Sequence, residues 1–303
     1  ALENNIDTIA MDAGDYLEGN MFYMADWGKK SYQVHGEAGF DVSVIGNHDY
    51  LMGERDLDAL LRDVDTSFQL LGANLHVPER YENINEKIKP YIEMEVNGVK
   101  IGIIGITIND ILYKWRLSES KISNEIKSAR KYARILKNRG NDLVIALTHI
   151  GLKKDKKLAK KVPEIDLIVG GHSHDALHEV YYQKSKKGKM IPIVQAGKHA
   201  EWLGQLIIDY DPDSNQLKVD DYKLLKVENS NKNMDIEYLV EEANQDLNDL
   251  YGESWLNETV GQSELRPQHL GGNGDTWIHF INDSMRETAN ADIAIHVDAL
   301  SGR

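Results

Sequence analysis

Four apolar runs of this sequence each end in side chains that can bind a metal ion or move a proton. In α/β proteins the ligand site lies beyond the carboxyl ends of the strands, because the loops converge there. Imidazole with carboxylate and carboxamide, without thiolate, suits Mn²⁺, Fe, Zn²⁺ or Ni²⁺ better than a pure oxygen site for Ca²⁺. We therefore predict a metal site formed by these loops. The candidate residues, in chain order, are Asp12, Asp15, Asn47, His48, Asp49, His149, His172, His174 and Asp175.

Each of these residues has a simpler interpretation when it is considered alone. A single histidine at the end of a strand is more often a hydrogen-bonded packing residue than a ligand. An aspartate in a glycine-containing loop is usually a turn former or a helix cap. Four such loops, each following an apolar run, are difficult to attribute to turns, and this recurrence favours the metal site. Glycines 14, 46, 170 and 171 would let the backbone turn tightly in these loops.

The elements that must position these residues alternate along the first two thirds of the chain. Nearly continuous Val, Ile and Leu runs separated by amphipathic helices predict an α/β protein with strands buried on both faces. The expected strands lie at 6–11, 42–45, 68–71, 101–106, 143–147 and 167–169. The expected helices lie at 20–37, 53–63, 121–138 and 153–162.

The pattern changes between residues 190 and 227, where successive strand-like segments predict antiparallel closure of the sheet with a turn at 211–215. A helix with a continuous apolar face is expected at 235–251. The segment from 258 onward resembles the start of a second α/β domain. Its expected elements are a strand beginning at 258, a helix at 275–289 and a strand at 292–296.

The composition excludes several classes of protein. The 303 residues carry 35 Lys and Arg against 49 Asp and Glu, a net charge of −14, which argues against general binding of nucleic acid or anionic lipid. The absence of cysteine excludes disulfides, thiolate metal sites and thiol nucleophiles. No apolar run reaches the roughly 18–20 residues of a membrane-spanning helix. The chain has neither an initiator methionine nor a signal peptide, and we interpret both of its ends as cut.

The motif segments 12–19, 46–49, 148–149 and 170–174 resemble four of the five sequence blocks of the calcineurin-like metallophosphoesterases. The order of these segments and the residues around them are most similar to the 5′-nucleotidase branch of that family. The resemblance implies a four-layer α/β/β/α sandwich over residues 1–229 and a linker helix over 230–257. It also implies that 258–303 is the beginning of a C-terminal substrate domain, hence a partial second α/β domain.

The resemblance further implies a site with two divalent metal ions, which would be Zn, Mn, Co or Fe, and a bridging hydroxide that attacks phosphorus. By family position, Asp15 is the bridging carboxylate. Asn47, His149 and His172 would complete one metal site, and His174 would serve the other. His48, with Asp49 beside it, belongs to the catalytic segment, where His48 would stabilise the leaving oxygen or protonate it.

Two departures from the family pattern stand out. The family's first block, an Asp-x-His, is missing from this chain, so the second metal would have only Asp15 and His174. We therefore expect the 303 residues alone to bind at most one ion tightly and to be nearly inactive. Leu51 stands where nucleotidase relatives carry an aspartate, so a carboxylate that orients His48 must come from elsewhere or be absent.

The leading functional hypothesis is a phosphomonoesterase that acts on nucleotides, a small-molecule phosphate ester rather than nucleic acid. The alternatives are a 2′,3′-cyclic phosphodiesterase, a pyrophosphatase, a sulfur-ester hydrolase or a degenerate homologue that binds without turnover. Arg303 is the candidate substrate contact. The resemblance implies a periplasmic or extracellular protein and leaves its oligomeric state open. The other histidines considered, His35, His76, His178 and His199, are expected to be surface or packing residues.

Overall fold

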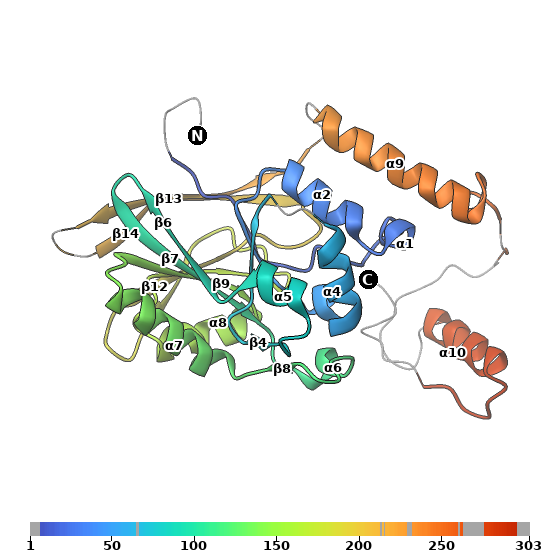
Figure 1. The fold of residues 1–303 in the computed structure, drawn as a ribbon, viewed down its shortest axis with the longest axis horizontal. Helices are drawn as coiled ribbons and strands as arrows, with labels where there is room; N and C mark the ends of the chain where they lie inside the picture. Colours follow the sequence, from blue (N-terminus) through green and yellow to red (C-terminus); the bar gives the residue numbers. More distant parts are fainter. Residues whose placement is uncertain are drawn as a thin grey trace. The chain divides into compact units, whose positions relative to one another are not determined.

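The computed structural model describes residues 7–64, 67–212, 214, 216–228, 232–259, 261–262 and 276–295. The chain divides into two compact units, Ala1–Glu253 and Ser254–Arg303. The predicted metal-binding loops all lie in the first unit, which contains both large sheets (Figure 1).

The smaller sheet of the first unit has four parallel strands in the order β1-β2-β3-β5. The larger sheet has six strands in the order β11-β12-β10-β9-β7-β6, of which the central four are parallel and the two edge strands antiparallel. The strands of the smaller sheet are β1 (Met11–Asp12), β2 (Val42–Val44), β3 (Gln69–Leu71) and β5 (Ile88–Lys89). Those of the larger sheet are β6 (Tyr91–Val96), β7 (Val99–Thr107), β9 (Leu143–His149), β10 (Leu167–Gly170), β11 (Tyr181–Lys184) and β12 (Met190–Gln195).

The described helices of the first unit flank these sheets and their connecting loops. In chain order they are α1 (Tyr23–Asp26), α2 (Lys29–Glu37), α3 (Asn47–Tyr50), α4 (Glu54–Asp63), α5 (Glu82–Lys87), α6 (Ile111–Lys114), α7 (Glu125–Asn138), α8 (Leu152–Lys161) and α9 (Met234–Tyr251). None of the helices in the described ranges is long and apolar enough to cross a membrane.

Three apolar cores separate four layers. The middle core joins the two sheets through buried residues such as Val44 and Leu71 on one side and Ile103 and Ile145 on the other. The sheets approach so closely that a Cβ on Gly105 would overlap the Cβ of Leu71. The outer cores pack α2 and α4 on the smaller sheet, and α7 and α8 on the larger one (Figure 1). The four-layer α/β/β/α arrangement predicted from the sequence is confirmed.

One predicted helix is interrupted. The segment expected to be helical at 20–37 forms α1 and α2, separated by Trp27 and Gly28. Both residues have left-handed backbone angles, with φ of 59° and 98°. Glycine adopts such angles without the Cβ clash that other residues meet, so Gly28 allows the chain to change direction before α2 begins.

The prediction of antiparallel closure at 190–227 is only partly correct. β12 instead pairs in parallel with β10, and β11, which was not predicted, pairs antiparallel with its other edge. β13 (Trp202–Asp211) and β14 (Gln216–Lys226) do form an antiparallel hairpin, but as a separate two-stranded sheet. Apolar side chains of this hairpin, including Leu206 and Ile208, pack against the middle core. A further short pair joins β4 (Leu75–His76) to β8 (Lys121–Ile122).

The predicted linker helix corresponds to α9, which packs against α1 and α2 and buries Ala243 and Leu247. In the second unit the structure describes one helix, α10 (Thr276–Thr288). The predicted strands at 258–265 and 292–296 do not form in those of their residues that the structure describes. The domain boundaries at 229 and 257 stay predictions.

Candidate metal centre

The metal-binding loops come from both large sheets. Asp15 follows β1 and Asn47 follows β2 in the smaller sheet, whereas His149 ends β9 and His172 follows β10 in the larger one. β1 runs parallel to β2, and β9 runs parallel to β10, so the two strands of each pair end on the same side of their sheet. All four residues therefore lie at the carboxyl ends of their strands. The predicted site therefore lies where the ends of two packed sheets meet, rather than at the edge of one sheet.

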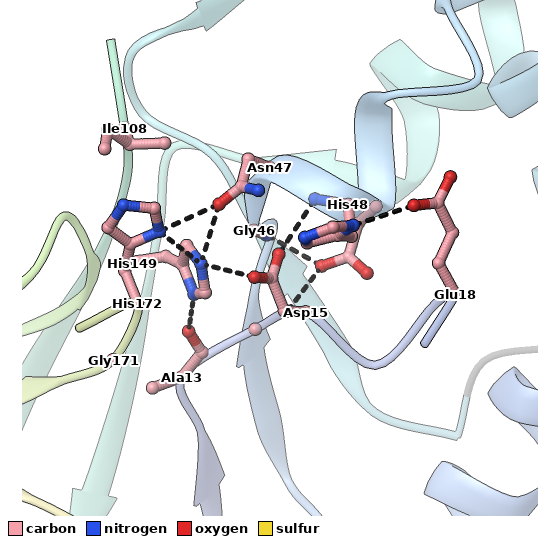
Figure 2. Close-up of polar contacts among 12 residues, drawn as sticks. Ala13, Asp15, Glu18, Gly46, Asn47, His48, Ile108, His149, Gly171 and His172 are labelled. Atoms are coloured by element: carbon pink, nitrogen blue, oxygen red, sulfur yellow. Dashed lines mark hydrogen bonds and ion pairs between the residues drawn. The ribbon is translucent and has the colours of Figure 1, made fainter. Parts of the chain in front are cut away.

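The imidazole of His149 is buried and its two nitrogens have different partners. Nδ1 lies 2.6 Å from the backbone carbonyl oxygen of Ala13, which can only accept a hydrogen bond, so Nδ1 donates. Nε2 faces the opposite way, 2.9 Å from Oδ2 of Asp15 and 3.1 Å from Oδ1 of Asn47 (Figure 2). A backbone acceptor that takes the proton of one ring nitrogen leaves the other nitrogen available as a metal ligand.

His172 completes the cluster from the larger sheet. Its Nδ1 lies 2.9 Å from Oδ1 of Asn47 and 3.3 Å from Nε2 of His149. The ring packs edge-to-face on Tyr113, with centroids 5.5 Å apart. Asp15 and His172 both have left-handed backbone angles, with φ of 65° and 76°. Such angles are costly for non-glycine residues and are concentrated at functional sites, where the surroundings impose them.

The charges of the cluster are coupled. Burial would raise the pKa of Asp15, but its hydrogen bond with His149 and that histidine's charge lower the pKa below its usual value. Burial would lower the pKa of His149, and the same contact with Asp15 raises it instead. Burial, reinforced by the charge of His149, lowers the pKa of His172 to about 4. His172 therefore presents a neutral imidazole, the form that binds metals.

His48 lies beside this cluster without entering it. Its backbone N–H donates to Oδ1 of Asp15 at 2.9 Å, while its ring is turned away from His149 and His172 (Figure 2). Nδ1 of the ring is 2.7 Å from Oε2 of Glu18, a contact that was not predicted from the sequence. This hydrogen bond is the largest cause that raises the pKa of His48 above its usual value. The side chain of His48 remains 42% exposed, so a ligand can reach it.

Asp49, predicted with His48 as part of the catalytic segment, is fully buried. Its carboxylate accepts three backbone N–H groups, from Gly46 at 2.7 Å, Asp15 at 2.9 Å and Leu17 at 3.1 Å. These bonds tie the loop after β1 to the loop after β2. Asp49 therefore holds the backbones that carry Asp15 and Asn47, and its oxygens are already occupied within the protein.

Residues 1–176 match the family described as Calcineurin-like phosphoesterase. The chain belongs to this family. It is 28% identical over 276 residues to a snake venom 5′-nucleotidase of Gloydius brevicauda, a match that covers 85% of this chain and 46% of the relative. It is 30% identical over 221 residues to a 5′-nucleotidase of Diplobatis ommata, covering 68% of this chain and 38% of the relative. The chain thus spans less than half the length of these curated relatives.

Two solved structures share the fold. A 5′-nucleotidase precursor from Thermus thermophilus superposes with a TM-score of 0.75 at 23% identity, over 82% of this chain and 51% of that protein. The NAD nucleotidase of Haemophilus influenzae superposes with a TM-score of 0.76 at 20% identity, over 94% of this chain and 60% of that protein. At these identities the likeness establishes the architecture of the calcineurin-like chain, not its substrate.

The cluster fits the divalent metal ions that calcineurin-like phosphoesterases use. Among the residues that the structure describes, Asp15, His149 and His172 offer ligand atoms within 4.8 Å of one another. Oδ1 of Asn47 lies at hydrogen-bonding distance from both imidazoles and so adds a fourth oxygen or nitrogen donor. Oxygen and nitrogen atoms that converge on one point repel each other unless a proton or a cation lies between them. Four such ligands, two of them imidazoles, suit Zn²⁺ or a similar ion.

The other candidates are not among the described residues whose ligand atoms converge in this group. The side chain of His174 is exposed, with its ring centroid 6.4 Å from that of His199. Asp175 accepts a hydrogen bond from the hydroxyl of Ser173 at 2.5 Å. Asp12 accepts the backbone N–H of Gly14 at 2.8 Å and shapes the turn before Asp15. Arg303 lies outside the described residues.

Three of the four histidines assigned to packing or to the surface lie in such positions, whereas the ring of His199 lies beside that of His174. His35 is buried between the rings of Tyr16 and Phe40, which stack on it at 4.9 and 4.3 Å. His76 is exposed and pairs with the hydroxyl of Ser123 at 2.9 Å. The ring of His178 contacts Trp202 edge-to-face at 5.2 Å.

Proposed function

We propose that this chain carries the metal-binding part of a 5′-nucleotidase-like phosphoesterase, which releases phosphate from nucleotides. The main support is the convergence of Asp15, Asn47, His149 and His172 from four separate strand ends of two sheets. Several curated relatives of the chain are named 5′-nucleotidases, which supports a nucleotide as the substrate.

Four atoms would hold one divalent ion: Oδ2 of Asp15, Oδ1 of Asn47, Nε2 of His149 and Nδ1 of His172. When bound, divalent ions polarise phosphate oxygens and lower the pKa of water, so that hydroxide is available near neutral pH. The ligands of this site would be held rigidly, because Asp49 fixes the Asp15 loop and Ala13 fixes the ring of His149. His174 would belong to a second ion, as the family resemblance implies.

His48 would serve the leaving group. We assign it this role because it follows Asn47 directly, its backbone N–H contacts Asp15, and its exposed side lets a substrate approach. An imidazole held at this position can donate a proton or a hydrogen bond to the departing oxygen, a contribution of about 10²–10⁴ in rate. Arg303 would contact the substrate from the C-terminal segment.

The 5′-monoester is favoured over the alternatives by the number of relatives that carry that name. One curated relative is a trifunctional nucleotide phosphoesterase of Bacillus subtilis, 25% identical over 328 residues, so diester substrates belong in the same test. We also propose that the protein works outside the cytoplasm, with support from the venom origin of relatives such as that of Gloydius brevicauda.

The test is a hydrolysis assay on the whole natural protein loaded with Mn²⁺, Zn²⁺ or Co²⁺, in which both released phosphate and the nucleotide products are measured. The substrates are AMP, 2′,3′-cyclic AMP, NAD and p-nitrophenyl phosphate. We expect AMP to be hydrolysed, and His172→Ala to abolish hydrolysis. His76→Ala is the matched control, because this exposed histidine lies outside the cluster, and it should keep full activity. Binding of metal and nucleotide without release of phosphate would refute the proposal and indicate a non-catalytic homologue.

A further inference from the structure

Glu18 contacts the candidate leaving-group histidine from a different strand end. It lies three residues after Asp15 in the loop that follows β1, whereas His48 lies in α3 after β2. Oε2 of Glu18 is 2.7 Å from Nδ1 of His48, and its side chain is 27% exposed (Figure 2). The backbone of Glu18 has a left-handed φ of 61°, which a glutamate adopts only when its surroundings impose it.

This contact determines which ring nitrogen of His48 is free. A carboxylate accepts the proton of Nδ1, so Nε2 is the nitrogen left to face a bound ligand. The backbone of His48 is also held, because its N–H donates a hydrogen bond to Oδ1 of Asp15 at 2.9 Å. Two contacts with the loop after β1 therefore define both the position of His48 and the direction of its ring.

The two other carboxylates whose charges act on His48 are those of Asp15 and Asp49, and both have other partners. Asp15 faces His149 with one oxygen and accepts the backbone N–H of His48 with the other. Asp49, the next residue, is buried and already accepts three backbone N–H groups. Position 51, one helical turn after His48, is occupied by Leu51, which has no polar side-chain atom. A carboxylate from the neighbouring loop reaches the ring instead.

We propose that Glu18 is the positioning residue of His48, supplying from the β1 loop the carboxylate that position 51 lacks and directing Nε2 toward the leaving oxygen of the substrate. The inference rests on the proposed function in one respect, namely that a substrate leaves from the side of His48. The Glu18–His48 contact itself is independent of turnover, so it can be tested without activity.

The first test is a measurement of the His48 ring by ¹⁵N NMR in the unmodified protein and in Glu18→Gln. We expect the unmodified protein to show an Nδ1 proton that is hydrogen-bonded and protected from exchange with water, with Nε2 as the exchanging nitrogen, and the variant to lose this protection. Glu79→Gln, at an exposed carboxylate outside the site, is the matched control and should leave the ring signals unchanged. Identical ring signals in all three proteins would overturn the proposal.

The second test compares leaving groups in the metal-loaded whole protein. For AMP, whose leaving oxygen needs a proton, Glu18→Gln should lower kcat by about 10–100-fold, as for a lost supporting hydrogen bond, with KM and metal content unchanged. For p-nitrophenyl phosphate, whose leaving group departs unaided, kcat should change little. Equal losses for both substrates would show a structural effect and overturn the proposal.

A relocated carboxylate provides the rescue. Residues three apart on a helix are neighbours, so Leu51→Asp in the Glu18→Gln background places a carboxylate beside His48. We expect this double variant to recover AMP hydrolysis and the ring signals, and no recovery in a folded, metal-loaded double variant would count against the positioning role. If the unmodified protein hydrolyses neither ester, the proposed function fails, whereas the NMR comparison still decides whether Glu18 positions the ring.

Discussion

Nδ1 of His149 donates a hydrogen bond to the carbonyl oxygen of Ala13 at 2.6 Å, and this bond joins the two sheets at the candidate metal cluster. His149 is the last residue of β9 in the larger sheet, and Ala13 directly follows β1 in the smaller one. The bond therefore sets the tautomer of a candidate ligand and links the two packed layers at this point. A change in either sheet near this point should affect metal binding.

Replacement of His149 by alanine should remove the central ligand of the cluster. The buried cluster would lose a nitrogen that lies 2.9 Å from Asp15 and 3.1 Å from Asn47, so we expect metal affinity to fall at least about 100-fold. Calorimetric titration with Zn²⁺ and Mn²⁺ measures this directly. A variant that binds as tightly as the unmodified protein would show that the ion lies elsewhere.

Metal binding should also stabilise the fold. An ion that binds the folded state alone, at about 100 times its Kd, raises the free energy of unfolding by about 2.7 kcal/mol. We expect a thermal-shift experiment to show this gain in the unmodified protein and in His76→Ala, but not in His149→Ala. A shift that persists in His149→Ala would assign the stabilisation to another site.

His48 should affect turnover but not metal content, because its ring is turned toward Glu18 and away from the cluster. We expect His48→Asn in the whole protein to keep its metal while kcat for AMP falls by about 10²–10⁴. Metal analysis of the same sample used for kinetics separates the two effects. Loss of metal to the extent seen in His149→Ala would make His48 a ligand instead.

Gly46 should tolerate no side chain. A Cβ at this position would overlap Oδ1 of Asp15 and lie 2.5 Å from its backbone nitrogen, so Gly46→Ala must displace a candidate ligand. We expect a loss of about 1–3 kcal/mol in the free energy of unfolding, as for other overpacked sites, together with weaker metal binding. Gly204→Ala in β13 is the control, since its Cβ would meet neighbours only at 3.6 Å and beyond. Urea unfolding compares the two variants, and equal stabilities would contradict the expectation.

His35 should make stability depend on pH. Burial lowers its pKa in the folded protein to about 4 from the ordinary value of 6.5, so the unfolded chain takes up the proton first as the pH falls. The contribution of the buried, neutral His35 to the free energy of unfolding is complete above about pH 6.5 and is lost progressively toward pH 4. Between about pH 7.5 and pH 5 this loss amounts to about 2 kcal/mol.

The measurement is urea unfolding of the unmodified protein and of His35→Gln at both pH values. Glutamine can still bond with Ser43, which contacts His35 at 2.5 Å, but it does not titrate. We expect the stability advantage of the unmodified protein over the variant to shrink by about 2 kcal/mol at the lower pH. Parallel pH dependence of the two proteins would show that His35 does not titrate in this range.

The layered fold and the members of the cluster could be predicted from the sequence because both follow from local patterns. Strands buried on both faces require continuous apolar runs, as in β7 and β9, and the loops after parallel strands converge wherever the strands are aligned. Asp15, Asn47, His149 and His172 stand at such strand ends and do meet, whereas His174, expected from the same pattern to join them, is exposed and outside this group.

The roles of individual residues depended on contacts between distant segments, which no local pattern encodes. Glu18 resembles any other loop glutamate until the packing of the two loops places it 2.7 Å from His48. The burial of Asp49 and its three backbone N–H bonds, which tie two loops together, were likewise visible only in the structure. The separate β13–β14 sheet also depends on packing of its apolar side chains against the middle core.

The difference between what the sequence determined and what only the structure decided has a physical reason. Hydrophobic periodicity and the chemistry of strand-end residues are properties of short segments, so the sequence determined the layers and the candidate metal ligands. Hydrogen-bond partners are selected among side chains tens of residues apart, by the distances that two packed sheets impose. Only the tertiary structure decided that a carboxylate of the β1 loop orients the histidine of α3, because that choice required the two sheets to meet.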